Sequence, residues 1–408
     1  MQKNTFARIV CSLLVEFVLL LTACGGASAT PSLREQSLVT EVAALQTQLA
    51  MTIVPSAPTR MALTPTPTLD AIATRLDQYI QGQSGFSGAV LVAQKGKVLL
   101  EKGYGLADRQ NDVPNTPQSK FAIGSMTKAF TAMSIMILQE RGKLSVQDPI
   151  CNYIKDCPAT WKAITLHHLL THTSGIPNYT NFFDKFHMCE AYTPDDVVAK
   201  FKDLPLDFAP GDHWSYSNSG YFLLGMVIEK VSGGSYENFI QENIFKPLGM
   251  ADTGYDRAST IVKNRAVGYS FDPTSKQPVN IICIDVSLKF AAGALYSTVG
   301  DLYKWDQSLY TDQLVSKETL NTIFTSTVVV PVGGMGMFPD GGMYGYGWVI
   351  AQPAGHRTFE HVGSVPGFLT YFVRYPDDQL TVIVLPNVDN LDTASINRGL
   401  AAIALGIK

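Results

Sequence analysis

The spacing of apolar residues predicts a succession of helices and strands from residue 69 onward. Apolar side chains recur at helical spacing between Ser125 and Arg141, and Gly142 follows as a helix terminator. Two apolar runs, 88–93 and 97–102, flank a short polar turn and predict a β-hairpin. Further helices are expected at 69–80, 193–203, 219–232, 235–244, 299–309, 317–324 and 392–405, and further strands at 344–351, 356–361, 368–375 and 380–386.

The order of these elements predicts one domain over residues 69–408, of the α/β (α+β) class. Strands are expected at both ends of the domain and helices in its middle. That order suits a single antiparallel sheet built from both chain ends, flanked by helices and joined to an all-helical region.

Residues 1–23 have the pattern of a targeting segment. Lys3 and Arg8 precede an apolar stretch, 9–21, which is too short for a convincing transmembrane helix, although Glu16 within it is atypical. The stretch ends in Leu-Thr-Ala-Cys-Gly, which resembles a bacterial lipobox and makes Cys24 the expected lipidation site. The alternative is an ordinary secretory signal. Both place the domain outside the cytoplasm, and the first anchors it by lipid to a bacterial membrane.

Residues 24–68 have the composition of a tether rich in Pro, Thr and Ala. Apolar residues repeat at helical spacing between Leu38 and Leu49, which indicates one short helix or a short coiled coil. We expect this segment to be a stalk between membrane and domain.

Charge and cysteine content narrow the possible partners and the compartment. Only 16% of residues are charged, the net charge is -4, and no long basic run occurs, which argues against a nucleic-acid partner. Cys151 and Cys157 are close enough in sequence to close a disulfide loop in an oxidising compartment, although two free thiols are the alternative. A bond between Cys189 and Cys283 is possible.

The first candidate for chemistry is the pair Ser125 and Lys128. Residues three apart share a helix face, so the amine can approach the hydroxyl. A serine needs a base to become a nucleophile, and a lysine in a dry pocket can serve because desolvation lowers its pKa. By itself the spacing is also compatible with a capping serine and a solvent-facing lysine.

Two further segments carry side chains suited to the same chemistry. Tyr216 and Asn218 stand two apart before a predicted helix, where a phenol can shuttle a proton and an amide can hold a carbonyl on the acyl side of the substrate. His361, Gly363 and Ser364 lie in a predicted strand, which can donate a backbone N–H to an oxyanion and pair with an extended substrate. A half-buried tyrosine in a turn and a structural histidine are the alternatives.

Together, S-x-x-K at 125–128, Y-x-N at 216–218 and H-V-G at 361–363 resemble the serine β-lactamase and penicillin-binding protein superfamily. The Y-x-N form is similar to the branch that contains class C β-lactamases, D-alanyl-D-alanine carboxypeptidases, D-aminopeptidases and esterases. The stretch 165–177 is common in that branch, and the resemblance covers residues 70–405.

The resemblance implies a role for each motif residue. Ser125 is the acylated nucleophile, Lys128 and Tyr216 share the general-base and proton-shuttle work, and Asn218 orients the substrate. His361 stands at the place of the K-T-G lysine, where it can donate to a carboxylate or help proton transfer. Gly363 allows close backbone approach, and the backbone N–H groups of Ser125 and Ser364 are expected to form the oxyanion hole. Class C β-lactamases usually carry Lys-Thr-Gly where this chain has His-Val-Gly, which weakens the case for efficient antibiotic hydrolysis.

We therefore expect an exported serine hydrolase that forms a covalent acyl-enzyme on a D-amino-acid peptide, a β-lactam or a small ester or amide. The alternative is a non-catalytic penicillin-binding or cell-wall-sensing protein of the same fold. No cofactor is expected. His168 and His172 have a spacing found in metal sites, but Leu169 stands where the glutamate of H-E-x-x-H would be, so no metal is expected. The sequence leaves the substrate and the oligomeric state open.

Overall fold

The computed structural model describes residues 37, 40, 69–325, 327–334 and 338–407. The chain divides into two units, 1–66 and 67–408, and the architecture below is that of the second. Cys24, the leader and the apolar repeat of the tether lie outside the described residues, so these predictions are untested. None of the helices in the described ranges is long and apolar enough to span a bilayer.

The core of the second unit is an antiparallel sheet of eight strands in the order β10-β11-β12-β13-β14-β15-β1-β2. The N-terminal hairpin pairs directly with the last strand, since Gly88 lies opposite Pro386 and Gln94 opposite Leu380. Both ends of the domain therefore build one sheet, as predicted. Its strands are β1 (Gly88–Gln94), β2 (Lys97–Tyr104), β10 (Val328–Val330), β11 (Gly342–Tyr344), β12 (Val349–Ala351), β13 (Thr358–Val365), β14 (Phe368–Tyr375) and β15 (Leu380–Pro386).

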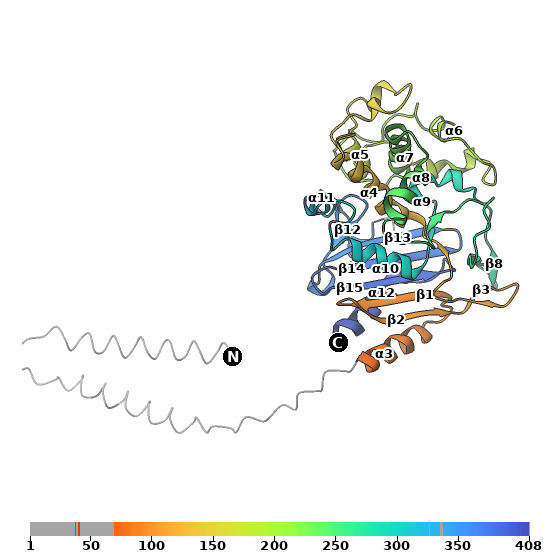
Figure 1. Cartoon of the computed structure of the whole chain (residues 1–408), viewed down its shortest axis with the longest axis vertical. Helices are drawn as coiled ribbons and strands as arrows, with labels where there is room; N and C mark the ends of the chain where they lie inside the picture. Colours follow the sequence, from red (N-terminus) through yellow and green to blue (C-terminus); the bar gives the residue numbers. More distant parts are fainter. Residues whose placement is uncertain (1–36, 38–39, 41–68, 326, 335–337, 408) are drawn as a thin grey trace, which may run out of the picture. The chain divides into compact units, whose positions relative to one another are not determined.

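Alternating side chains of the central strands form two hydrophobic layers. Val90 and Val92 of β1 face one side, where they pack with Leu76 of α3 and Leu400 of α12. Leu91 belongs to the layer on the other side, with the central helices. Helices α3 (Leu69–Gln81) and α12 (Thr393–Leu405) thus cover one face of the sheet, and α10 (Val299–Ser308) packs on the other (Figure 1).

The all-helical region surrounds α4 (Thr127–Glu140), which is buried from Thr127 to Leu138. This helix lies between the sheet and α7 (Asn218–Ser232), at the centre of the domain (Figure 1). Because this stretch is enclosed by its neighbours, the polar groups between Thr127 and Leu138 are kept from water. The other helices of this unit are α5 (Leu166–Leu170), α6 (Pro194–Val198), α8 (Tyr236–Ile240), α9 (Phe290–Gly293) and α11 (Lys317–Ile323).

Short strands connect the helical region to the large sheet. They form three small antiparallel sheets, β3 (Leu106–Asp108) with β4 (Val113–Pro114), β5 (Phe121–Ala122) with β9 (Leu295–Ser297) and β6 (Gly254–Tyr255), and β7 (Tyr269–Phe271) with β8 (Pro278–Asn280). These strands are two or three residues long. Apolar periodicity cannot reveal elements of that length.

Most of the predicted long elements are confirmed, but several differ in extent. The strand expected at 356–361 is β13, which runs on to Val365, and the helix expected at 235–244 is α8 followed by the π-helical turn η5 (Gln241–Phe245). The strand expected at 344–351 is two strands, β11 and β12, joined by a turn at Gly347, whose φ is +78°. A side chain there would also come within 2.9 Å of the Lys128 carbonyl oxygen, so the turn packs directly on α4. The helix expected at 193–203 is shorter, because α6 ends at Val198 and the chain continues in turns.

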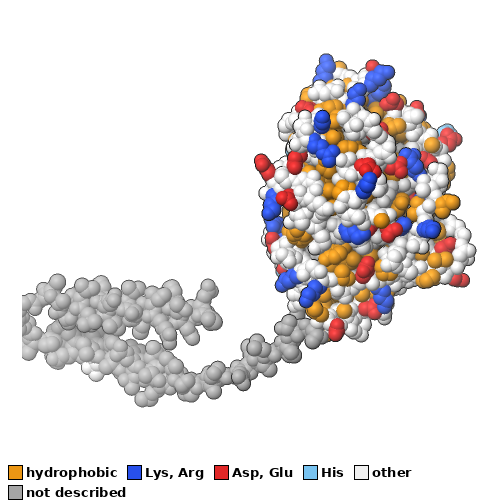
Figure 2. Space-filling model, in the orientation of Figure 1, with side chains coloured by type: hydrophobic (Ala, Val, Ile, Leu, Met, Phe, Trp, Pro, Cys, Tyr) orange, Lys and Arg blue, Asp and Glu red, His pale blue; other side chains and the backbone are white. Residues whose placement is uncertain are grey.

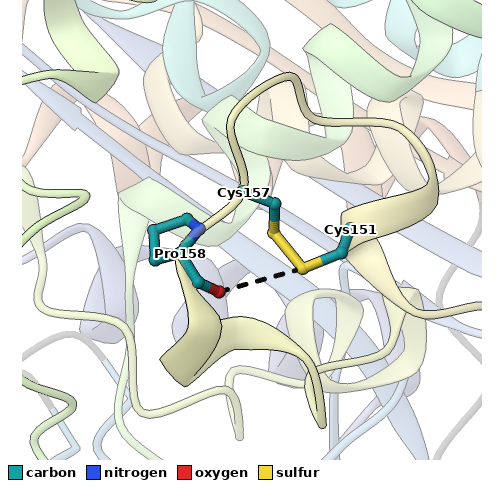
Figure 3. The surroundings of a disulfide bond; sticks show 3 residues. All are labelled: Cys151, Cys157 and Pro158. Atoms are coloured by element: carbon teal, nitrogen blue, oxygen red, sulfur yellow. Dashed lines mark hydrogen bonds between the residues drawn. A yellow bond between two sulfur atoms is a disulfide. The ribbon is translucent and has the colours of Figure 1, made fainter.

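The four cysteines of this unit lie at two places. Cys151 and Cys157 are joined by a disulfide that closes a short surface loop, and the carbonyl oxygen of Pro158 lies 4.0 Å from the Cys151 sulfur (Figure 3). Cys189 and Cys283 are free and exposed. On the face drawn in Figure 2, positive and negative side chains are interspersed among apolar ones, so neither sign dominates it.

Candidate active site

Ser125 lies where the chain turns from the sheet into the buried central helix. It is the middle residue of the 3-10 turn η1 (Gly124–Met126), and α4 begins directly afterwards at Thr127. Gly124 has a φ of +51°, a left-handed conformation that favours glycine. The turn therefore presents the Ser125 hydroxyl to a cavity at the N-terminal end of α4.

Lys128 meets Ser125 one helical turn later and is fully buried. Its Nζ lies 3.1 Å from the Ser125 Oγ, 2.8 Å from the Asn218 Oδ1 and 2.8 Å from the Ala292 carbonyl oxygen. Burial lowers the pKa of Lys128 well below its usual value, because the ammonium is deprived of water. A neutral amine donates to two of these acceptors and can accept the Ser125 proton at its lone pair.

Tyr216 lies against the amine, with its ring centre 4.8 Å from the Lys128 Nζ. Burial raises the pKa of the Tyr216 phenol above its usual value, and the neighbouring Ser125 side chain opposes this rise. The hydroxyl is buried and has no hydrogen bond of full geometry with the described part of the chain. Tyr216 therefore keeps its proton at neutral pH and has a free donor beside Ser125.

Asn218 is the first residue of α7 and contacts Lys128 of α4. Its Oδ1 accepts from the lysine, while its Nδ2 donates to the Thr180 Oγ1 at 3.2 Å. Its backbone N–H donates to the Asn178 side chain at 3.0 Å. These bonds fix the Asn218 amide at the wall of the cavity. The S-x-x-K motif at 125–128 and the Y-x-N motif at 216–218 therefore meet at one place.

Strand β13 passes directly behind Ser125. A Cβ added to Gly363 would lie 1.9 Å from the Ile123 carbonyl oxygen and 2.3 Å from the Thr370 Oγ1. A Cβ on Gly124 would lie 3.0 Å from the backbone nitrogen of Ser364. The main chains at Ser125 and Ser364 are thus neighbours only because both contact points are glycines. The oxyanion hole assigned to their N–H groups stays a prediction that this proximity supports.

A network that sequence reasoning missed lies behind Tyr216. The His172 ring packs 4.4 Å from the Tyr216 ring, and its Nδ1 accepts from the Ser217 backbone N–H at 3.1 Å. The Nε2 therefore carries the proton and donates to the Tyr344 hydroxyl at 3.1 Å. That hydroxyl is 3.3 Å from the His361 Nε2, and the His361 Nδ1 is 2.7 Å from the Val362 carbonyl oxygen.

These contacts form a chain of neutral donors and acceptors, from Ser217 through His172 and Tyr344 to His361. Burial lowers the pKa of His172 well below its usual value, with smaller contributions from Lys128 and His361. Burial and then Lys128 lower the pKa of His361 to about 3. His172 has a φ of +59°, uncommon for a residue with a side chain, which shows that its position is held by its surroundings.

We expected His361 to be able to donate to a substrate carboxylate, but its ring is not placed to do so. Its Nδ1–H is directed to the Val362 carbonyl and its Nε2 to Tyr344, so neither nitrogen has a free proton to offer. The side chain is buried, and it is not among those that line the cavity at Ser125. The physical reason is packing beneath α4, which a lone His-x-Gly motif does not reveal.

The cavity next to Ser125 has a volume of about 220 Å³. It lies on the Asn218 side of the nucleophile, since Asn218 lines it and Tyr216 does not. Its walls are Ser125, Tyr179, Thr180, Phe183, Asn218, Ile284, Leu288, Lys289, Ala292, Gly293, Ser364, Val365 and Pro366.

The three clustered histidines contact protein groups. His167 binds the Tyr346 hydroxyl at 2.8 Å, and His168 accepts from the Thr165 backbone N–H at 3.2 Å as part of a helix cap. His172 belongs to the network behind Tyr216. Among the residues that the structure describes, no group of three His, Cys, Asp or Glu side chains could hold a metal ion.

Comparison with known proteins agrees with this geometry. The Beta-lactamase family model matches residues 72–405. Penicillin-binding protein 4* of Bacillus subtilis is 33% identical over 317 residues, which cover 74% of this chain and 68% of that protein.

Solved structures share the fold. The penicillin-binding protein of Bacillus halodurans has a TM-score of 0.70 at 27% identity, covering 83% of this chain and 99% of its own. The octameric penicillin-binding protein homologue of Pyrococcus abyssi reaches 0.71 at 31% identity, covering 82% and 77%. The D-stereospecific amidohydrolase of a Streptomyces species reaches 0.67 at 25% identity, covering 83% and 99%. The chain therefore belongs to the Beta-lactamase family and has the fold of its penicillin-binding proteins.

Proposed function

We propose that this protein is an exported serine hydrolase that forms a covalent acyl-enzyme on Ser125. The observation that carries the proposal is the buried Lys128 amine, 3.1 Å from the Ser125 Oγ and shielded from water. Burial lowers the pKa of a lysine in that position, which favours the neutral form that can take a proton from a hydroxyl. The proposed substrates are D-amino-acid peptides or amides, small esters and β-lactams.

The proposed reaction uses the residues in a fixed order. The Lys128 Nζ takes the Ser125 proton while the Oγ attacks the carbonyl carbon, and the N–H groups of Ser125 and Ser364 stabilise the oxyanion. When the bond to the leaving group breaks, the Tyr216 hydroxyl protonates that group and regains its proton from the Lys128 ammonium. Water then attacks the acyl carbon, its proton returns through the same groups, and Ser125 is released.

The neutral state of His361 indicates which leaving groups the site favours. A leaving group that carries a carboxylate, as in β-lactams, finds no cationic donor at this strand position. The relatives include penicillin-binding proteins and a D-stereospecific amidohydrolase. We propose D-amino-acid amides and esters as better substrates than nitrocefin.

Export is the second part of the proposal. The leader and the lipobox support it, and so does the disulfide between Cys151 and Cys157, since such bonds persist in oxidising compartments. Replacing Cys24 by Ala is expected to release the protein from the membrane fraction of the host. Continued membrane binding of that variant would refute the lipid anchor.

The experiment that tests catalysis is active-site labelling followed by a substrate panel. A fluorophosphonate or a fluorescent penicillin is expected to label the native protein, and Ser125→Ala is expected to remain unlabelled. Rates on nitrocefin, a D-Ala-D-Ala peptide, a D-amino-acid amide and p-nitrophenyl acetate then identify the preferred bond. Stable labelling with no turnover of any of them would instead indicate the sensor function.

A further inference from the structure

Lys289 contributes the charged side chain to the wall of the cavity next to Ser125. It lies between the 3-10 turn η6 (Val286–Leu288) and α9, which carries the Ala292 carbonyl that binds Lys128. Its side chain also lines a second cavity of about 400 Å³. Ile284, Val365 and Pro366 line both cavities too, so the two spaces adjoin.

The Lys289 amine has no partner of its own within the described ranges. No hydrogen bond or ion pair joins it to another described residue. The two nearby carboxylates are already engaged, because Asp256 pairs with Arg265 at 2.5 Å and Asp285 accepts from the Ser287 N–H at 2.9 Å and from its hydroxyl at 2.6 Å. The side chain is partly buried at the wall of the cavity, so its unpaired amine is available to a ligand that carries a negative charge.

The electrostatics of this wall suit one negative charge on the ligand. Burial lowers the pKa of Lys289, and Asp256 and Asp285 oppose the fall and favour the ammonium. The same two carboxylates repel a group of higher negative charge. A single carboxylate can pair with the ammonium of the lysine and avoids that repulsion.

The position of Lys289 assigns it to the acyl part of a substrate. The cavity lies on the Asn218 side of Ser125, opposite the Tyr216 hydroxyl that serves the leaving group. In addition, β12 pairs only with β13 residues Thr358 to Glu360, so the end of β13 near Ser364 has no strand on that side in the described structure. An extended acyl group can follow that free edge past Val365 toward Lys289.

We propose that Lys289 binds a carboxylate on the acyl portion of the substrate, so that the enzyme selects acids over neutral acyl groups. The inference rests on the proposed acyl-enzyme at Ser125 and adds its substrate class. Lys289 is a specificity residue in this scheme, since it contacts the substrate several atoms away from the reacting carbonyl.

The test compares two esters with one leaving group. The mono-p-nitrophenyl ester of adipic acid carries a free carboxylate on its acyl chain, and the p-nitrophenyl methyl diester is its neutral counterpart. The native enzyme is expected to have the higher kcat/KM on the acid. Lys289→Met is expected to lower that value about tenfold, the loss of one charge-assisted contact. Its kcat/KM on the diester is expected to stay within about twofold of the native value.

Three controls separate the possible causes. Lys289→Arg is expected to retain most of the preference, because it keeps the charge. Lys263→Met, at an exposed lysine, makes the same change in net charge and is expected to leave both rates unchanged. Added salt is expected to reduce the preference of the native enzyme and to have little effect on Lys289→Met.

Two outcomes would contradict the inference in different ways. Equal loss on both esters in Lys289→Met, or an unchanged preference for the acid, would overturn the role of Lys289 and leave the acyl-enzyme proposal intact. If neither ester acylates Ser125 in the native protein, as read by mass spectrometry after quenching, the proposed function and this inference both fail.

Discussion

Gly363→Ala is the substitution that tests whether β13 must contact the nucleophile turn. The added methyl group would lie 1.9 Å from the Ile123 carbonyl oxygen and 2.3 Å from the Thr370 Oγ1, so the strand and the turn must separate by more than 1 Å to relieve the contact. Overpacking of this kind typically costs about 1–3 kcal/mol of folding free energy. The movement also carries the Ser364 N–H away from the oxyanion, and losing one such donor costs about 100- to 1,000-fold in rate.

The assay measures acylation and stability on the same samples. Acylation is followed by fluorophosphonate labelling over time, and the free energy of unfolding is obtained from urea denaturation. Gly234→Ala is the matched control, because a Cβ there has no atom within 4 Å and its backbone is not left-handed. The control is expected to be native in both measurements. If Gly363→Ala is acylated at the native rate, β13 does not supply an oxyanion donor and this account of the site is wrong.

Four other predictions follow, three from buried groups and one from a pair of exposed cysteines. Because burial lowers the pKa of Lys128, the rate of acylation is expected to rise with pH as the ammonium loses its proton and then to level off. Between the folded and the unfolded pKa of Lys128, the folded state holds fewer protons than the unfolded state. The contribution of Lys128 to stability therefore increases with pH up to its unfolded pKa. Lys128→Met is expected to acylate at least about 100-fold more slowly, and a native rate in that variant would contradict the base assignment. Tyr344→Phe leaves a donor on His172 and an acceptor on His361 unsatisfied and is expected to cost about 1–3 kcal/mol in urea denaturation, whereas a neutral result would show that the network is not stabilising. Cys283 raises the pKa of Cys189, which places the two exposed thiols side by side, so oxidised glutathione is expected to convert them to one disulfide; glutathione adducts on both would refute this.

The sequence predicted those parts of the site that depend on local spacing. Ser125 and Lys128 are one turn apart at the start of a helix whose apolar pattern is unambiguous, so their proximity follows from helix geometry alone. Tyr216 and Asn218 were found as the Y-x-N motif of the family that the sequence resembles, at the start of another clear helix. The two ends of the sheet were predicted for the same reason, since long apolar runs near residues 90 and 382 need a common core.

The remainder depends on contacts between distant segments, which apolar periodicity does not encode. The link from His172 to Tyr344 spans 172 residues, and no local pattern distinguishes that tyrosine from an ordinary core residue. Lys289 follows a short turn and looks like a surface lysine until the walls of the cavity are known. The motif at His361 located the right strand, but the orientation and burial of its ring are set by the helix above it.

His361 and Lys289 together determine where the site can bind a negatively charged group of the substrate. At the strand position, where the resemblance implies a cation or a proton donor, His361 is locked in a neutral chain and has no donor to spare. The uncompensated amine stands instead at Lys289, across the cavity on the acyl side. A substrate that fits both facts has an uncharged leaving group and an acidic acyl group. That combination disfavours β-lactams and peptides ending in a free carboxylate, and it favours amides and esters of acids that carry a second carboxylate, which is the order that the ester pair and the substrate panel measure.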